Sequence, residues 1–271
     1  MKNIRRVIIA ILVIVLGVSF VGCGKRESDT NKIKIGVNGT DFTIWNYIKE
    51  ELDKESIELD VVSFSDYIQP NVALAEGEID INSFQTEIYF NQFITDRHLD
   101  LASIGYSVIA PMAIFSESIT DINDTPQNAK VAIPTDATNG GRALIILEQA
   151  GLIKLREDVG ATPTVNDIIE NPRNLEITSV DPNLIPRSLQ DIELGVINSN
   201  IAVNAGLKPL EDSIYIQDIN DEDAKNYYNI FAVRNGEQER SELKRIVEVY
   251  RTEPVKELIE EVYGGAQIPL F

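Results

Sequence analysis

Short apolar strands alternate with amphipathic helices from residue 32 to the end of the chain, and no other feature of the sequence restricts the fold as strongly. Residues 32–37 show the alternating, β-branched pattern of a strand, and the apolar residues of 44–52 recur at helical spacing. A chain of this kind buries a sheet between layers of helices. The pattern therefore predicts the α/β class, with mostly parallel sheets that are covered on both faces.

The order of the strands divides the 271-residue chain into two α/β lobes. Residues 32–112 form lobe I, residues 113–230 form lobe II, and residues 231–271 return to lobe I, so that two crossover segments join the lobes. A strand predicted at 229–234 makes the return. Two lobes with two crossings are typical of proteins that hold a small ligand in the cleft between the lobes and close by hinge motion.

Several segments have a less regular pattern. Residues 101–115 form a long apolar run, which Pro111 makes too broken for one central strand. Helices are expected at 84–93, at 164–170 and at 184–191.

The N-terminus has the pattern of a secreted lipoprotein. A basic start leads into an apolar run that ends at Phe20 and is too short for a membrane-spanning helix of roughly 20 residues. The sequence predicts a signal peptide over 1–22, then Cys23 and a flexible tether over 23–31. Phe20-Val21-Gly22-Cys23 resembles a bacterial lipobox, and Cys23 is the only cysteine. Lipidation of Cys23 would anchor the protein to the cell membrane on its extracytoplasmic side. An uncleaved anchor with an incidental cysteine is the alternative.

The charge of the chain excludes some partners. It has 43 acidic residues against 24 lysines and arginines, a formal net charge of −19. Nucleic acid is not expected as a partner, because phosphate binding needs a basic surface. Electrostatic docking on anionic lipid is disfavoured for the same reason. The acidic excess indicates a strongly solvated surface.

The stretch 130–151 is the best candidate for a binding site in the bare sequence. It has the pattern of a buried strand, a polar loop and a helix that begins with Asn139 as N-cap and ends at Gly151. A helix N-terminus attracts anions, and Arg142 in its first turn would oppose the helix dipole unless an anion were bound there. A guanidinium can hold a carboxylate by two parallel hydrogen bonds. The alternative is a surface arginine paired with a nearby acid.

Five motifs carry a more specific signal, namely Phe64-Ser-Asp-Tyr-Ile-Gln-Pro-Asn71, Ile133-Pro-Thr-Asp-Ala-Thr-Asn-Gly-Gly-Arg-Ala-Leu144, Glu170-Asn-Pro-Arg173, Val196-Ile-Asn-Ser-Asn200 and Asn229-Ile-Phe-Ala-Val-Arg234. In order and spacing they resemble the NlpA-like methionine-binding lipoproteins over the whole chain from about residue 32. The resemblance implies a two-lobe periplasmic-binding-protein fold (type II-like) with its ligand cleft between the lobes. It also implies a small-molecule ligand, a monomer, and docking on an ABC permease served by its ATPase.

The resemblance further implies roles for particular side chains. Arg142 would grip the α-carboxylate of an amino acid, while Asn198 and Asn229 would hold its polar end. Thr86 and Asn139 belong to the same predicted site. Aromatic residues would enclose the ligand side chain, and these are Phe64, Tyr67, Phe84 and Tyr89. The chemistry fits an amino acid, which needs an anion clamp, amide acceptors for its ammonium group and an apolar box. Taken singly, each aromatic residue would be better explained by core packing.

The chain departs from the family pattern near the expected side-chain end of the cleft. Thr86 stands where the family usually has histidine, Ile88 replaces a proline, and Ala110 replaces a tyrosine. The loops 38–42 and 135–139 also differ. These departures leave three ligands open, which are methionine, another apolar or sulfur-containing amino acid, and a methionyl dipeptide.

Two other classes of protein compete with a solute-binding protein. An enzyme is not expected, because the only histidine, His98, lies in a polar run, and no nucleophile elbow, P-loop or metal-ligand spacing occurs. Acidic residues are plentiful, so a catalytic carboxylate pair stays open as the enzymatic alternative. A surface adhesion lipoprotein on the same fold is the second alternative, which an occluded cleft would favour. No cofactor and no metal are expected.

Overall fold

The computed structural model describes residues 32–40, 42–220 and 222–271. Residues 33–271 form one compact unit. The predicted signal peptide (1–22), Cys23 and the tether (23–31) lie outside the described residues, so their predictions stay untested. Over the described ranges, no helix has the length and apolar character needed to cross a bilayer.

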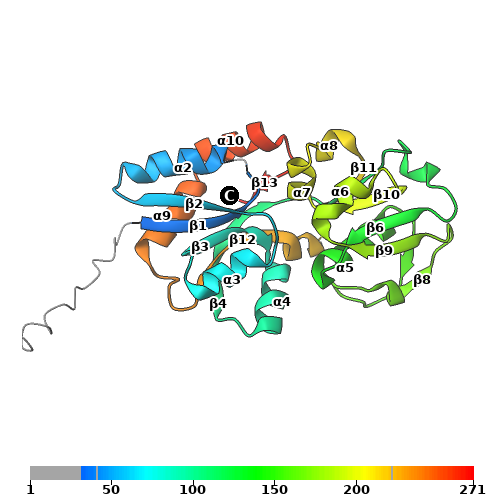
Figure 1. Ribbon diagram of the computed structural model, residues 1–271, viewed down its shortest axis with the longest axis horizontal. Helices are drawn as coiled ribbons and strands as arrows, with labels where there is room; N and C mark the ends of the chain where they lie inside the picture. The colour runs from blue at the N-terminus through cyan, green and yellow to red at the C-terminus, as the bar shows by residue number, and fades with distance from the viewer. Residues whose placement is uncertain (1–31, 41, 221) are drawn as a thin grey trace, which may run out of the picture. The chain divides into compact units, whose positions relative to one another are not determined.

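The first sheet has six strands within the described residues (Figure 1). In spatial order they are β13 (Ile268–Pro269), β4 (Leu101–Ile109), β12 (Tyr228–Arg234), β3 (Ile81–Thr86), β1 (Lys32–Asn38) and β2 (Glu58–Phe64). β1 and β3 are parallel, with Ile35 opposite Ile81. β12 is antiparallel to both of its neighbours, β3 and β4. The strand predicted to return from the second lobe therefore lies inside the first sheet.

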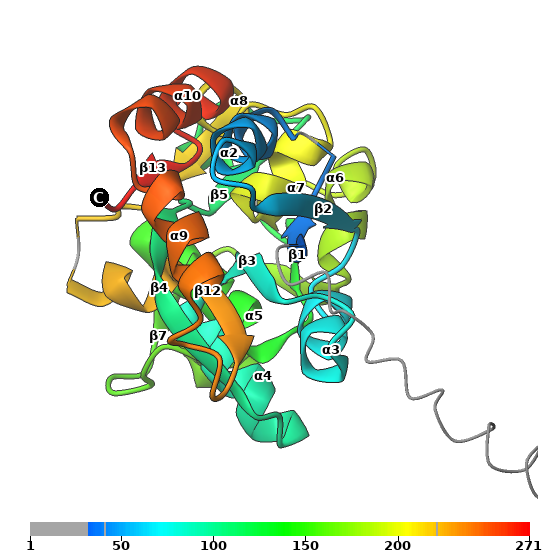
Figure 2. The same cartoon turned by 90° about the vertical axis from the view of Figure 1, so that its left-hand side faces the viewer.

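Helices cover both faces of the first sheet, namely α2 (Thr43–Asp53), α3 (Gln69–Glu76), α4 (Glu87–Arg97), α9 (Ser241–Tyr250) and α10 (Glu253–Tyr263). α2, α9 and α10 pack on one face around Phe231, and Figure 2 shows α9 lying across β12 and β4. α3 and α4 pack on the other face against Ile230 and Ala232. Neighbouring residues of β12 thus point to opposite faces, and Ile230, Phe231 and Ala232 are all fully buried. The expected covering of both faces is confirmed for this sheet.

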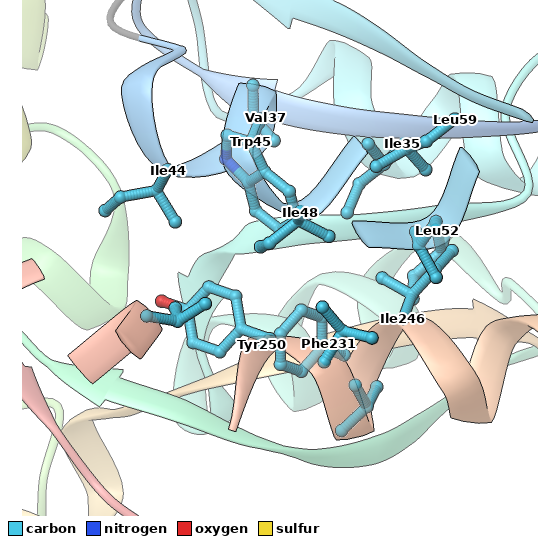
Figure 3. Close-up of a cluster of buried hydrophobic side chains, with 14 of the residues drawn as sticks. Ile35, Val37, Ile44, Trp45, Ile48, Leu52, Leu59, Phe231, Ile246 and Tyr250 are labelled. Atoms are coloured by element: carbon cyan, nitrogen blue, oxygen red, sulfur yellow. The ribbon is translucent and has the colours of Figure 1, made fainter. Parts of the chain in front are cut away.

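The apolar stripe of α2 joins that helix to the core. Ile48 and Leu52 are fully buried in the cluster drawn in Figure 3, and burial of each such side chain contributes about 1.5–3 kcal/mol. Trp45 packs its ring against Tyr250, with 5.6 Å between ring centroids. Trp45 therefore packs in the core with Tyr250, and it also lines the cavity described below.

The second sheet has five strands in the described part of the chain (Figure 1). In spatial order they are β11 (Ser213–Ile216), β5 (Ala113–Phe115), β10 (Leu194–Ile197), β6 (Lys130–Pro134) and β9 (Glu176–Val180). β6 is parallel to β10 and to β9, whereas β5 is antiparallel to β10 and to β11. A separate two-stranded ribbon pairs β7 (Lys154–Leu155) with β8 (Ile168–Glu170).

The second sheet is also covered on both faces, by α5 (Ala137–Gln149), α6 (Ile185–Ser188) and α7 (Ser199–Asn204), while α8 (Pro209–Asp212) precedes β11. α5 packs on one face through Leu144 and Leu147. α6 and α7 pack on the other face through Ile185 and Ile201. A side chain at Gly195 would meet Ile185 at 2.9 Å, so glycine is required for α6 to approach β10 this closely.

The prediction of mostly parallel sheets is wrong, because both sheets are mixed. β12 enters the first sheet antiparallel to its neighbours, and β5 does so beside β10 in the second. These strands lead to or return from the other lobe, so they do not continue the strand–helix–strand succession of the sheet they join. Strands covered on both faces are apolar throughout, and their pattern does not reveal their direction.

The helix predicted at 84–93 is wrong in its first turn. β3 continues to Thr86, and α4 begins at Glu87 with Thr86 as its N-cap. Pairing with β12 explains the longer strand, since Thr86 lies opposite Asn229 in the register. Long-range pairing here overrides the local helical pattern.

Two other segments differ from the predictions in detail, and a third agrees with its prediction. Residues 164–170 contain a single 3₁₀ turn, Val165–Asp167, followed by β8 rather than a helix. Residues 184–191 contain only α6, preceded by the 3₁₀ turn Pro182–Leu184. Residues 101–115 divide into β4 and β5, and the break falls at Pro111 as the sequence indicated.

Candidate ligand-binding site

A cavity of about 90 Å³ lies among residues contributed by both lobes. Of the predicted ligand-binding residues, only Phe64 is absent from its wall. The others line it, namely Tyr67, Phe84, Thr86, Tyr89, Asn139, Arg142, Asn198 and Asn229. The three aromatic residues and Thr86 come from β3, α4 and the segment before α3. Asn139 and Arg142 come from α5, and Asn198 lies at the start of α7. One water needs roughly 10–15 Å³, so this cavity admits something larger than a single water.

α5 begins earlier than predicted, and Asn139 is not its N-cap. Asp136 is the N-cap, and its Oδ1 accepts a hydrogen bond from the backbone N–H of Asn139 at 2.9 Å. The loop offers two good N-cap residues, and the first of them starts the helix. Ala137 occupies the first helical position. Arg142 therefore lies in the second turn, where the helix dipole opposes it less.

Arg142 is buried, with 2% of its surface exposed. Its Nε and Nη2 donate to Oε1 of Gln217 at 3.0 and 2.5 Å, and Nη2 also donates to the carbonyl oxygen of Ala110 at 2.8 Å. Its guanidinium carbon lies 4.2 Å from the centroid of the Tyr227 ring. Among the described residues no carboxylate lies within ion-pair distance, so the alternative of an arginine paired with an acid at the surface is wrong.

The surroundings of Arg142 leave a buried cation without a counter-charge. Burial lowers the pKa of the guanidinium to about 10, which still keeps Arg142 charged at neutral pH. A buried charge is costly unless it is paired. The hydrogen bonds within the described residues leave Nη1 unused, although the side chain lines the cavity. Its two hydrogens are therefore available to an anion there.

A second polar group of the cavity is an acceptor without a donor. Nδ2 of Asn198 donates to Oδ1 of Asn139 at 2.7 Å. Oδ1 of Asn198 is the only buried side-chain nitrogen or oxygen in the described ranges that has no hydrogen-bond partner. Leaving a buried acceptor unsatisfied costs about 1–3 kcal/mol, so this oxygen favours a ligand that donates.

Three aromatic rings line one side of the cavity. Tyr67 stacks on Phe84 with 6.1 Å between centroids, and Tyr89 meets both rings edge-on. The Tyr89 hydroxyl donates to the carbonyl oxygen of Tyr67 at 2.8 Å, which fixes the ring. Burial raises the pKa of both tyrosines, so both stay neutral. Thr86 borders these rings and caps α4 by accepting from the N–H of Tyr89 at 3.3 Å.

Phe64 does not line the cavity. It packs with Val62 and Ala75 against the core between the first sheet and α3, and its ring edge lies 3.0 Å from where a side chain on Gly36 would begin. Alternate residues of a strand share a face, so Phe64 follows Val62 into this core. The prediction that Phe64 contacts the ligand finds no support in this geometry.

The structure adds residues that were not among the predicted ligand-binding residues. Gln217 is 5% exposed, and its Oε1 accepts from both Arg142 and the backbone N–H of Met112. Asn200 joins the lobes, since its Oδ1 accepts from the Tyr67 hydroxyl at 2.6 Å and its Nδ2 donates to Asn38 at 3.2 Å. Gln217 lies 75 positions from Arg142 in the sequence, and such long-range partners leave no local signal.

The described residues contain no group of three or more histidine, cysteine, aspartate or glutamate side chains placed to hold a metal ion. The cavity has instead one cation, amide groups and aromatic rings, which suit an organic zwitterion. The family model of the NlpA lipoprotein matches residues 33–271.

The chain belongs to the NlpA lipoprotein family. The D-methionine-binding lipoprotein MetQ of Escherichia coli K12 is 37% identical over 254 residues, which are 92% of each chain. A nutrient-binding protein from Burkholderia cenocepacia, solved bound to methionine, is 35% identical, with a TM-score of 0.83 over 88% of this chain and 100% of the other. The substrate-binding protein of a methionine transporter from Streptococcus pneumoniae is 34% identical, with a TM-score of 0.83 over 89% and 96%.

The comparisons confirm two of the expectations from the sequence. The resemblance to NlpA-like lipoproteins is confirmed over nearly the whole described chain. The two-lobe α/β fold is confirmed by the likeness to solved substrate-binding proteins of this family. The ligand-binding roles of individual side chains stay predictions.

Proposed function

We propose that this NlpA-family lipoprotein captures a free amino acid, methionine in the first place, and delivers it to an ABC importer. The observation that carries the proposal is Arg142, a buried cation at the cavity with no carboxylate partner among the described residues. A ligand carboxylate supplies the missing charge and turns a costly group into a clamp. The names of the relatives, which refer to methionine and to a methionine transporter, support the same ligand.

Each part of the cavity has a role in this proposal. Arg142 binds the α-carboxylate, and Oδ1 of Asn198 accepts from the ammonium group, with Asn229 as a second amide in the wall of the same cavity. Tyr67, Phe84 and their neighbours enclose the thioether side chain, where each sulfur–aromatic contact is worth roughly 0.3–1.5 kcal/mol. No cofactor enters this scheme, and the protein acts as a binding subunit rather than an enzyme.

The rest of the scheme follows from the family and the N-terminal sequence. Cys23 carries a lipid that holds a monomer on the extracytoplasmic face of the cell membrane, beside the permease and its ATPase. Lobe I comprises 32–112 and 231–271, and lobe II comprises 113–230. The position of β12 in the first sheet favours placing the return crossing slightly earlier, before Tyr228.

Isothermal titration tests the proposed function directly. A soluble form of residues 24–271 is titrated with L- and D-methionine, leucine, norleucine and a methionyl dipeptide. We expect micromolar or tighter binding of methionine or of one of these relatives. No heat with any of them, and no shift in thermal unfolding, would reject an amino-acid carrier and favour an adhesion lipoprotein on the same fold.

Thr86→His tests the side-chain end of the cavity. Thr86 lines the cavity and caps α4, so the change places a new ring beside the ligand and removes a cap worth about 0.5–2 kcal/mol. We expect the ratio of dissociation constants for methionine, leucine and the dipeptide to change more than the unfolding temperature. Thr86→Ser keeps the cap and serves as the control, with unchanged ratios. A stability loss without a change in ligand preference would place the specificity elsewhere.

A further inference from the structure

Asp136 does not line the cavity, yet it begins a chain of hydrogen bonds that ends there. Its carboxylate accepts from Nδ2 of Asn139 through both oxygens, at 3.0 Å each, in addition to capping α5. A carboxylate has no hydrogen to donate, so it can face only the NH₂ end of the Asn139 amide. Asp136 therefore dictates which way the Asn139 side chain is turned.

The orientation of Asn139 is passed on to Asn198. With its NH₂ group held by Asp136, Asn139 presents Oδ1 to Asn198 and accepts from Nδ2 at 2.7 Å. That bond uses the NH₂ group of the Asn198 amide. The acceptor end of Asn198 is left buried and without a partner in the described residues, in a side chain that lines the cavity.

We propose that Asp136 is a positioning residue that, through Asn139 and Asn198, makes this point of the cavity an acceptor and so selects ligands that carry an ammonium group. The inference rests on the proposed function, because it concerns which end of the amino acid is read there. An amide alone could turn either way and present a donor or an acceptor. The carboxylate removes that freedom, because the reversed Asn139 would turn its oxygen toward the Asp136 oxygens.

The test is Asp136→Asn in the detergent-solubilised full-length protein. Asparagine caps helices as well as aspartate does, so α5 is kept, but its side chain can donate and no longer fixes the Asn139 amide. Three ligands are titrated: methionine, γ-(methylthio)butyrate, which lacks the ammonium group, and methioninol, which lacks the carboxylate. Wild type is expected to prefer methionine to both analogues.

In the variant we expect the preference for methionine over the deaminated analogue to fall about ten- to a hundredfold, the value of one charge-assisted hydrogen bond. The preference for methionine over methioninol should stay unchanged, because it reports on Arg142. Thr138→Val is the matched control, since Thr138 also donates to Oδ1 of Asp136, at 2.9 Å, but is not in the chain to Asn198. It should change neither preference.

The possible results distinguish a positioning role of Asp136 from a purely structural one, and both from failure of the proposed function. If all three ligands weaken by the same factor, Asp136 supports only the helix, and the proposed positioning role is overturned. Should Asp136→Asn unfold, as circular dichroism would show, Asp136→Ser keeps a capping hydroxyl that is too short to hold the amide, and the same loss of preference is expected. Failure of wild type to bind methionine or any other amino acid would instead reject the proposed function.

Discussion

Arg142→Ala is expected to weaken methionine binding by about 2–5 kcal/mol, on the order of thirtyfold to several thousandfold in Kd. The alanine would leave the ligand carboxylate in the cavity without its clamp, and desolvation of that charge would no longer be offset. The size of the effect follows from the environment of Arg142, which is 2% exposed and has no other acid to bind among the described residues. Isothermal titration with methionine measures it.

Arg173→Ala is the matched control for this change. Arg173 also belongs to the second lobe, and its guanidinium donates to the backbone carbonyl oxygens of Thr125 and Asn123 rather than to a ligand. It is absent from the wall of the cavity. Its loss should lower stability modestly and leave the affinity for methionine as it is. Wild-type affinity in Arg142→Ala would mean that another group binds the carboxylate.

The helices and strands with a strong local pattern were predictable from the sequence. The stripe through Ile48 and Leu52 gave α2, and the apolar run 130–133 gave β6. Strand direction was not predictable, since β12 is apolar on both faces whichever way it runs. The end of β3 was missed because Thr86 is held in the strand by a partner more than a hundred residues away, at Asn229.

The candidate site was predictable only in part. The residues that line the cavity were easier to predict than the residues that hold them in place. Arg142 was predictable because a cation near the N-terminus of a helix is unfavourable unless an anion binds beside it. The role of Asp136 as N-cap was within reach of the sequence, because aspartate precedes two residues that can begin a helix. Gln217 was beyond reach, since nothing near residue 217 indicates a contact with α5. Phe64 could have been excluded from the site once β2 was known to pack on α3, because it shares a face of that strand with Val62.

Phe84→Ala is expected to lower the affinity for methionine about ten- to a hundredfold, and by more than it lowers the affinity for norleucine. Phe84 contacts the rings of both Tyr67 and Tyr89, so its removal opens the aromatic wall and takes away both apolar contact and a sulfur–aromatic interaction. Norleucine has the same length without sulfur, and the wild-type preference for methionine over it should be roughly 0.3–1.5 kcal/mol. Titrating both ligands into both proteins gives a double-mutant cycle that isolates the sulfur contribution.

Phe64→Ala is the control that separates binding from packing. Both substitutions remove a phenyl ring from the first lobe, but Phe64 lies in the core beside α3 and not at the cavity. It should lower the free energy of unfolding and leave both affinities unchanged, because the wall formed by Tyr67, Phe84 and Tyr89 is intact. If Phe84→Ala behaves like Phe64→Ala, losing stability but not methionine binding, the ligand side chain does not rest on this wall. Thr86, which departs from the family pattern, would then be the next candidate for a contact with the ligand side chain.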